Sequence, residues 1–151
     1  MSLFGGKNKF NHYTIVIGCG QLGASLANTL SDVGVSVLII DKNPKEFSKL
    51  STSFGGITLV GDGTELSLLD DADIKQANAV VVVTNNDNIN ILIAQIAKEH
   101  FHVPHVIARL YDPERGCVYQ EFGIDTICPA ELSAKEINRI VNIQLKVEDE
   151  V

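Results

Sequence analysis

Three glycines near the start of the chain have the spacing of a phosphate-binding turn. Gly18, Gly20 and Gly23 form the pattern Gly-x-Gly-x-x-Gly between an apolar run and a helix-length stretch. Gly18 permits a tight turn, Gly20 lets the backbone approach a phosphate without an intervening Cβ, and Gly23 lets the helix pack close to a sheet. The N–H groups at the start of that helix favour an anion. Asp41 ends the next apolar run, where its carboxylate can accept both hydroxyls of an adenosine ribose.

This spacing predicts a nucleotide site, and the alternative is a glycine-rich turn whose acid only caps the strand end.

More polar residues follow later apolar runs: Asp62 and Gly63 follow one, and Thr84 and Asn85 follow the next. Because open α/β sheets bind ligands at the carboxyl ends of their strands, we expect these residues to converge. Asp62 would meet the adenine or its ribose, and Thr84 and Asn85 would donate to ribose or phosphate. A turn or a helix cap is the simpler alternative for each pair.

Arg109 follows another apolar run and supplies the one guanidinium that we expect near the site. It is a plausible phosphate partner; the alternative is a surface charge that pairs with Asp112 or Glu114. Cys19 lies inside the phosphate turn, where a helix N-terminus could lower the pKa of its thiol. We favour a small packed residue over a redox role for this cysteine.

The elements that must position these residues alternate between strand and helix. We expect strands at residues 14–18, 35–41, 57–61, 79–83, 105–109 and 126–128. We expect helices at residues 21–33, from 43–44 onward, after a Thr64 cap, and at 88–100, 113–122 and 133–144. Parallel strands need covered crossovers, so the class is α/β, a Rossmann-like doubly wound parallel sheet of six strands in the order 3-2-1-4-5-6. The 79–83 strand is the most apolar and should be central.

Helical spacing also predicts which side chains face the sheet. The expected inner positions are Leu22, Leu26, Ala27 and Leu30 in the first helix, and Ile89, Leu92, Ile93, Ile96 and Ala97 in the 88–100 helix. The last two helices carry more apolar residues than one sheet face requires, which predicts a dimer surface, with core packing as the alternative. These residues are Val118, Tyr119, Phe122, Ile137, Ile140, Val141 and Ile143.

Composition excludes several classes of function. The chain has 151 residues, 45% of them hydrophobic and 21% charged, as a single soluble globular domain would. Its net charge of −7 disfavours direct binding of nucleic acid or anionic membranes, and no apolar run approaches the roughly 20 residues that span a bilayer. Three cysteines without metal spacing suit a reducing cytoplasm. We expect residues 1–11 to be a flexible leader, 12–144 a single nucleotide-binding domain and 145–151 a tail.

Six motifs in this order resemble the N-terminal nucleotide-binding domain of the TrkA/Ktr family, also called the RCK or KTN domain. They lie at residues 18–23, 41–42, 61–64, 84–87, 108–113 and 122–130, and the resemblance covers roughly residues 12–142. It implies a cytoplasmic regulatory subunit of potassium transport that binds NAD(H) or AMP, ADP or ATP. It also implies a homodimer or higher ring that acts on a membrane pore subunit and is held at the inner face of the cell membrane by that partner.

The resemblance implies thirteen cofactor-binding residues: Gly18, Cys19, Gly20, Gln21, Leu22, Gly23, Asp41, Lys42, Asp62, Gly63, Thr84, Asn85 and Arg109. Gln21 stands where the family often has a basic residue, so Lys42, Arg109 and the helix N-terminus must meet more of the anion's charge. This difference favours a smaller ligand slightly. Gly63 replaces a more usual alanine and loosens its loop.

We predict a regulatory binding domain rather than an enzyme, because no second region remains to hold a substrate beside a nicotinamide. The alternative is an NAD-dependent oxidoreductase fragment, or a small enzyme completed by a partner chain. Asp41 would repel the 2′-phosphate of NADP. His100, His102 and His105 precede a strand rather than follow one, so we expect a solvated loop and neither a metal nor a catalytic site there.

Overall fold

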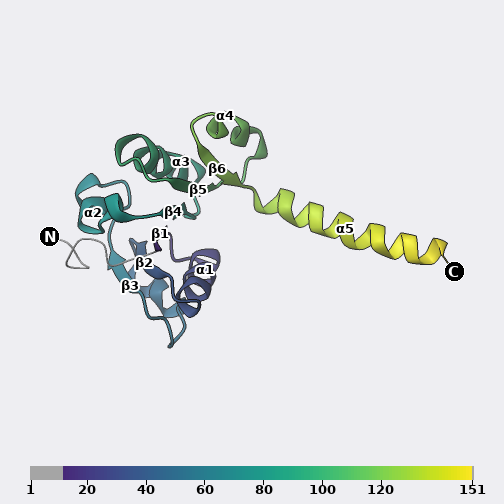
Figure 1. Ribbon diagram of the computed structural model, residues 1–151, viewed down its shortest axis with the longest axis horizontal. Helices are drawn as coiled ribbons and strands as arrows, with labels where there is room; N and C mark the ends of the chain where they lie inside the picture. Colours follow the sequence, from purple (N-terminus) through teal and green to yellow (C-terminus); the bar gives the residue numbers. More distant parts are fainter. Residues whose placement is uncertain (1–11, 151) are drawn as a thin grey trace.

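A computed structural model describes residues 12–150, and the expected leader at 1–11 lies outside these described residues. Six strands form one parallel sheet in the order β3-β2-β1-β4-β5-β6, which confirms the predicted topology (Figure 1). The strands are β1 (Tyr13–Ile17), β2 (Ser36–Asp41), β3 (Ile57–Val60), β4 (Ala79–Val82), β5 (His105–Arg109) and β6 (Ile124–Ile127). As predicted, β4 is central, between β1 and β5.

The helices alternate with these strands. The α-helices are α1 (Gln21–Asp32), α2 (Leu66–Asp71), α3 (Asp87–Gln95), α4 (Gly116–Gln120) and α5 (Pro129–Asp149). Four short segments are 3-10 or π-helical: η1 (Pro44–Lys49), η2 (Ile74–Gln76), η3 (Ile96–His100) and η4 (Pro113–Arg115). The helices predicted at 88–100 and 113–122 are therefore each divided between an α-helix and one of these segments.

The sheet is covered on both faces, which is why β1 and β2 are mostly apolar. One apolar cluster joins the sheet to α2, η2 and α3, and includes Leu69, Ile74 and Ile93. The other joins the opposite face to α1, through Val16, Ile39 and small α1 residues. All five residues of β1 are buried, as expected for a strand between two helical layers.

The register brings the carboxyl ends of neighbouring strands level with one another. Ile17 of β1 lies opposite Ile40 of β2 and Val82 of β4, and Val82 lies opposite Ala108 of β5. The next residue along each chain segment therefore emerges at a single edge of the sheet. Loops after four adjacent strands converge there.

Two predicted inner positions are wrong. Leu22 is 42% exposed and Leu92 is 47% exposed. In α1 the residues that face the sheet are small, namely Gly23, Ala24 and Ala27, so the helix lies close and its buried stripe is narrow. In α3 the buried positions include Asn90 and Ile91, which the spacing argument did not select.

Thr64 is not the N-cap of α2, contrary to the prediction. Glu65 occupies that position, without a side-chain cap hydrogen bond. The Thr64 N–H and hydroxyl donate instead to Asp62 Oδ1, at 2.9 and 2.7 Å. Thr64 therefore stabilises the loop that precedes α2 rather than the start of the helix.

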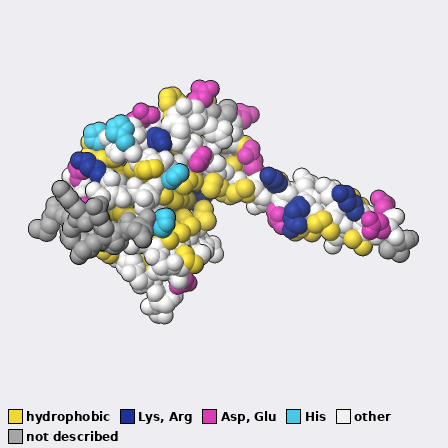
Figure 2. Space-filling view, in the orientation of Figure 1, with side chains coloured by type: hydrophobic (Ala, Val, Ile, Leu, Met, Phe, Trp, Pro, Cys, Tyr) yellow, Lys and Arg dark blue, Asp and Glu magenta, His cyan; other side chains and the backbone are white. Residues whose placement is uncertain are grey.

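α5 extends from the body of the molecule and is longer than the predicted helix at 133–144 (Figure 1). Pro129 occupies its first turn, a position that suits proline, and no glycine or proline interrupts the chain beyond it. No residue of α5 is buried, and hydrophobic side chains lie exposed along it (Figure 2). We retain 12–144 as the proposed extent of the nucleotide-binding domain. Of the helices in residues 12–150, none has the length and hydropathy needed to cross a bilayer.

Candidate nucleotide-binding site

A pocket of about 370 Å³ opens at the carboxyl edge of the sheet, between the parallel neighbours β1 and β4, where the chain continues from β1 to β2 on one side and from β4 to β5 on the other. This is the crevice in which doubly wound sheets bind ligands, and its volume suits a small organic ligand. The loops after β1, β2, β3 and β4 contribute, together with Arg109 at the end of β5. The lining residues are Gly18, Gly20, Ile40, Asp41, Lys42, Asn43, Glu46, Gly61, Asp62, Gly63, Val83, Thr84, Asn85, Ile89, Ile93 and Arg109.

The three motif glycines are required for different reasons. Gly18 has φ +106°, and a Cβ there would lie 2.8 Å from the Val83 carbonyl oxygen. A Cβ on Gly23 would lie 1.8 Å from the Gly18 carbonyl oxygen, so α1 packs directly on the turn. A Cβ on Gly20 would meet no protein atom within 4 Å. The fold itself therefore needs Gly18 and Gly23, whereas the missing side chain at Gly20 leaves open space beside the pocket.

The start of α1 suits an anion. It has no side-chain cap hydrogen bond and no acidic residue in its first turn. The first N–H groups of a helix lack intrahelical partners and carry partial positive charge. The open space at Gly20 gives a phosphate access to these groups, so the turn fits a phosphorylated ligand.

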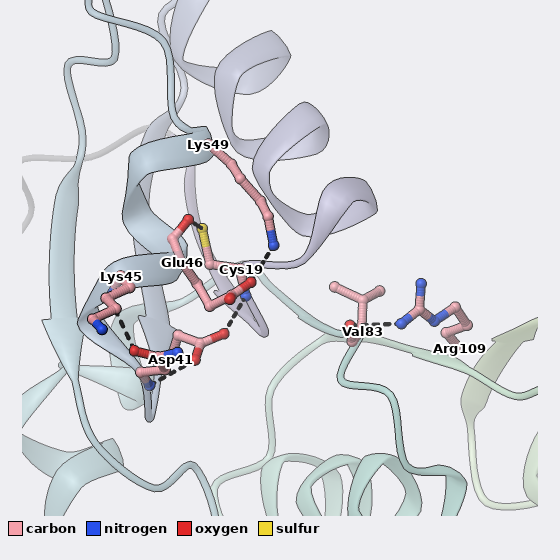
Figure 3. Close-up of polar contacts among 8 residues, drawn as sticks. Cys19, Asp41, Lys45, Glu46, Lys49, Val83 and Arg109 are labelled. Atoms are coloured by element: carbon pink, nitrogen blue, oxygen red, sulfur yellow. Dashed lines mark hydrogen bonds and ion pairs between the residues drawn. The ribbon is translucent and has the colours of Figure 1, made fainter.

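Asp41 is held in place by two backbone donors at the end of β2 (Figure 3). Its Oδ2 accepts the Cys19 N–H at 2.8 Å and its Oδ1 accepts the Asn43 N–H at 2.8 Å. A carboxylate has about four acceptor sites, so both oxygens can still accept hydroxyl groups. The carboxylate is therefore pre-positioned for a diol such as ribose.

Glu46 is a pocket residue that sequence reasoning missed. It belongs to η1, and its carboxylate pairs with Lys49. Nothing in the local pattern distinguishes it from an ordinary solvent-exposed acid in the first turn of a helix. Ile89 and Ile93 of α3 also line the pocket, although the sequence indicated them only as core residues.

Asp62 and Lys42 form the rim at the β3 side. The pKa of Asp62 is lowered, mainly by the Thr64 N–H and then by the Thr64 hydroxyl. Lys42 Nζ lies 3.4 Å from Asp62 Oδ2, in a pair whose lysine is largely exposed. Such a pair contributes little to stability, and it leaves opposite charges side by side in the pocket lining.

The β4 side of the pocket is built around a buried amide. Asn90 is fully buried; its Nδ2 donates to the carbonyls of Thr84 at 3.0 Å and Arg109 at 2.8 Å. Its Oδ1 accepts the Thr84 N–H at 3.0 Å and also the Thr84 hydroxyl. One side chain thus ties the end of β4 to the end of β5. Asn90 was not among the predicted site residues, because a polar residue in an amphipathic helix suggests a solvent-facing position.

Arg109 reaches from β5 over the end of β4. Its Nη2 donates to the carbonyl oxygen of Val83 at 3.0 Å (Figure 3). The same Nη2 donates to the carbonyl oxygen of Thr84 at 2.9 Å. Within residues 12–150 no carboxylate pairs with it, so the surface ion pair considered from the sequence is not formed.

Nine of the thirteen predicted residues line the pocket, and Cys19, Gln21, Leu22 and Gly23 do not. Gln21 and Leu22 begin α1 with exposed side chains. The Cys19 thiol is buried and donates to the Glu46 carbonyl at 3.4 Å. Burial, followed by the nearby Asp41 carboxylate, raises the pKa of Cys19 to about 11, which is opposite to the lowering considered from the sequence.

The histidines lie elsewhere. His105 begins β5 opposite Ala79, the first residue of β4, so it is at the amino edge of the sheet, away from the pocket. Among the described residues no group of histidine, cysteine and acidic side chains is arranged to hold a metal ion.

Structures of known proteins share this fold. The TrkA-N domain of the inner membrane protein YbaL from Escherichia coli superposes with a TM-score of 0.76 at 16% identity, covering 88% of this chain and 98% of that one. The AMP-bound Kef C-terminal domain of Shewanella denitrificans gives 0.74 at 22% identity, covering 89% and 82%. ADP-bound GsuK gives 0.72 at 22% identity, covering 91% and 35%.

Curated sequences are also related. The Trk system potassium uptake protein TrkA of Streptomyces coelicolor is 39% identical over 127 residues, which are 84% of this chain and 57% of that protein. The TrkA homolog of Pyrococcus abyssi is 30% identical over 137 residues, or 91% and 55%. The chain thus spans about half the length of these relatives. The model of the TrkA-N domain matches residues 14–129, and the chain therefore belongs to the TrkA-N domain family.

Proposed function

We propose that this chain binds an adenine nucleotide, either NAD(H) or AMP, ADP or ATP, and regulates a potassium-transport system. One observation carries the proposal: the anchored Asp41 carboxylate and the open start of α1 border the same crevice. A ribose diol and a phosphate are the two chemical groups that these features bind.

The expected pose follows from the order of the strands. The adenosine would lie on the β2 and β3 side, with its ribose on Asp41 and its adenine near Asp62 and Gly63. Its phosphate would lie at the N–H groups that begin α1. The AMP bound to Kef and the ADP bound to GsuK, proteins of the same fold, support this class of ligand. Asp41 and Glu46 together disfavour the 2′-phosphate of NADP.

The regulatory role rests on the loops that the ligand would join. Since loops after four strands line the pocket together with the end of β5, ligands of different size or charge would favour different loop positions. A ligand shifts such an equilibrium only by its differential affinity for the two states. The relatives named as potassium uptake proteins support a membrane pore subunit as the partner. We place this chain in the cytoplasm, held by that partner, without nucleic-acid binding or membrane insertion of its own.

The last two helices are the proposed route to a neighbouring subunit. Val118 is exposed on α4 and Phe122 just after it, and Ile137, Ile140 and Val141 are exposed on α5. A homodimer or higher ring would cover these apolar side chains. Analytical ultracentrifugation should find a dimer or larger assembly. A monomer at every concentration, with and without nucleotide, would contradict this part of the proposal.

Calorimetric titration of ligand-free protein with NADH, AMP, ADP and ATP tests the binding proposal. At least one should bind, and Asp41→Asn should weaken binding roughly 10- to 100-fold, because hydrogen bonds to a charged group contribute about 1.5–3 kcal/mol. Asp32→Asn is the matched control, since Asp32 is exposed at the end of α1. A folded protein that takes up no adenine compound at millimolar concentration would refute the proposal.

An assay with NADH and a panel of electron acceptors separates a regulator from the alternative, an oxidoreductase completed by a partner chain. We expect binding without turnover. Steady NADH oxidation that depends on Asp41 would favour the enzyme instead.

A further inference from the structure

Arg109 is a pocket residue with a buried polar atom that no other described residue satisfies. Its Nε is buried and has no hydrogen-bond partner among the described residues. Within residues 12–150 the guanidinium donates hydrogen bonds only through Nη2, to the carbonyls of Val83 and Thr84. A partly buried cation without a counter-charge is costly, and such groups normally meet an anion.

The other pocket-lining cation is already paired. Lys42 lies 3.4 Å from Asp62 Oδ2. The nearby Lys49 pairs with Glu46. Arg109 pairs with no carboxylate of residues 12–150, and the Tyr111 ring, whose centroid is 5.1 Å from Cζ, adds a face contact but no negative charge. Positive charge for an anion is therefore concentrated at Arg109.

Its position relative to α1 defines what it can reach. The carbonyls of Val83 and Thr84 follow β4, so Nη2 lies over the end of that strand, one strand from β1 and its turn. Adjacent strands are about 5 Å apart. Asp41, by contrast, ends β2, on the other side of β1. Figure 3 shows the two groups on opposite sides of the turn, with Asp41 near η1 and Arg109 beside Val83.

We propose that Arg109 is a second anion site, which makes the pocket selective for adenosine compounds that carry two or more linked phosphates. The proposal rests on the proposed function, with the ribose on Asp41 and the first phosphate at the start of α1. The next phosphate then extends from β1 toward β4, into reach of the guanidinium. AMP ends at the first phosphate and leaves Arg109 without an anion.

This selectivity differs from the slight preference for a smaller ligand that Gln21 suggested. The neutral Gln21 removes charge at the first phosphate only, where α1 N–H groups still donate. Arg109 acts on the second phosphate, and its planar guanidinium can bind phosphate oxygens in a bidentate manner. ADP, ATP and NADH share the linked phosphates, so they are the separate arms of the test.

Calorimetric titration of the wild-type chain and Arg109→Gln with AMP, ADP, ATP and NADH tests the proposal. In the wild type, at least one ligand with linked phosphates should bind about tenfold more tightly than AMP; Arg109→Gln should weaken that ligand roughly tenfold or more and AMP less than about threefold. Arg115→Gln is the charge-matched control, because Arg115 lies outside the pocket lining and donates to Asn88. It should leave all four affinities unchanged.

Arg109→Lys keeps the charge and should preserve part of the preference for linked phosphates. Unfolding midpoints of each variant verify that the fold is intact. If wild-type protein binds AMP as tightly as ADP, ATP and NADH, or if Arg109→Gln weakens AMP equally, the second anion site is refuted while the proposed function stands. If no ligand binds the wild type, the proposed function itself fails.

Discussion

Replacing Asn90 by leucine should destabilise the protein more than any exposed substitution in the same helix. Asn90 is fully buried and accepts or donates hydrogen bonds at the end of β4 and the end of β5. Leucine has the same branched shape and is somewhat larger, so the substitution removes the hydrogen bonds without opening a cavity.

The magnitude follows from the groups that lose their partner. These are the Thr84 N–H, the Thr84 carbonyl and the Arg109 carbonyl. The Thr84 hydroxyl also loses Asn90 Oδ1 but keeps the Asn86 carbonyl at 3.4 Å as an acceptor, so we do not count it. Each lost bond of this kind costs about 1 kcal/mol, so the free energy of unfolding should fall by about 3 kcal/mol. For a chain of this length such a loss lowers Tm by about 6–12 °C. The carbonyl of Thr84 also accepts from Arg109, which reduces the cost there.

Urea unfolding followed by circular dichroism measures the change. Asn90→Asp separates hydrogen bonding from shape, because a carboxylate would face the Thr84 and Arg109 carbonyls with no donor; it should cost at least as much as leucine. Asn88→Ala is the control, since Asn88 is exposed. A loss below about 1 kcal/mol for Asn90→Leu would show that the buried amide does not hold the two strand ends together.

The motif glycines and Cys19 give three further predictions. Gly18→Ala should destabilise the fold by at least about 2 kcal/mol in a denaturant titration, because its φ of +106° and the Val83 carbonyl 2.8 Å away both oppose a Cβ. Gly20→Ala should cost about 1 kcal/mol or less, as a change from glycine to alanine at an N-cap does, yet weaken nucleotide binding in calorimetry. Equal effects of the two substitutions on stability would contradict this division of roles. The pKa of Cys19 in the folded protein is raised to about 11, whereas a thiol in the unfolded chain ionises at about pH 8.5. The protonated thiol therefore stabilises the folded state fully below about pH 8.5, and this stabilisation is lost as pH rises toward 11, because the unfolded thiol ionises first. Between about pH 8.5 and 11 the free energy of unfolding should therefore fall less for Cys19→Ala than for the wild type, as measured by denaturant unfolding at several pH values. If the two free energies fall in parallel with pH, the Cys19 thiol does not account for this pH dependence.

Much of the scaffold was predictable because its sequence signals are local. The strands are short apolar runs bounded by glycine, asparagine or proline, and the crossover rule for parallel strands leaves few topologies. Gly18 and Gly23 belonged to a spacing whose steric reasons are known in advance. The predicted ends of the last helix and the predicted burial of Leu22 were wrong. Burial depends on which surfaces meet and not on helical spacing alone.

Within the site, the sequence alone determined which chain segments converge, since the strand order predicted from it places Gly18, Asp41, Val83 and Arg109 at one edge. Tertiary structure alone decided which polar atoms are already engaged. Asn90 is buried and links the end of β4 to the end of β5, and Glu46 lines the pocket. Arg109 donates to two carbonyls, while its Nε has no partner among the described residues. Hydrogen bonds between residues far apart in the chain depend on three-dimensional distance and burial, and a one-dimensional pattern contains neither.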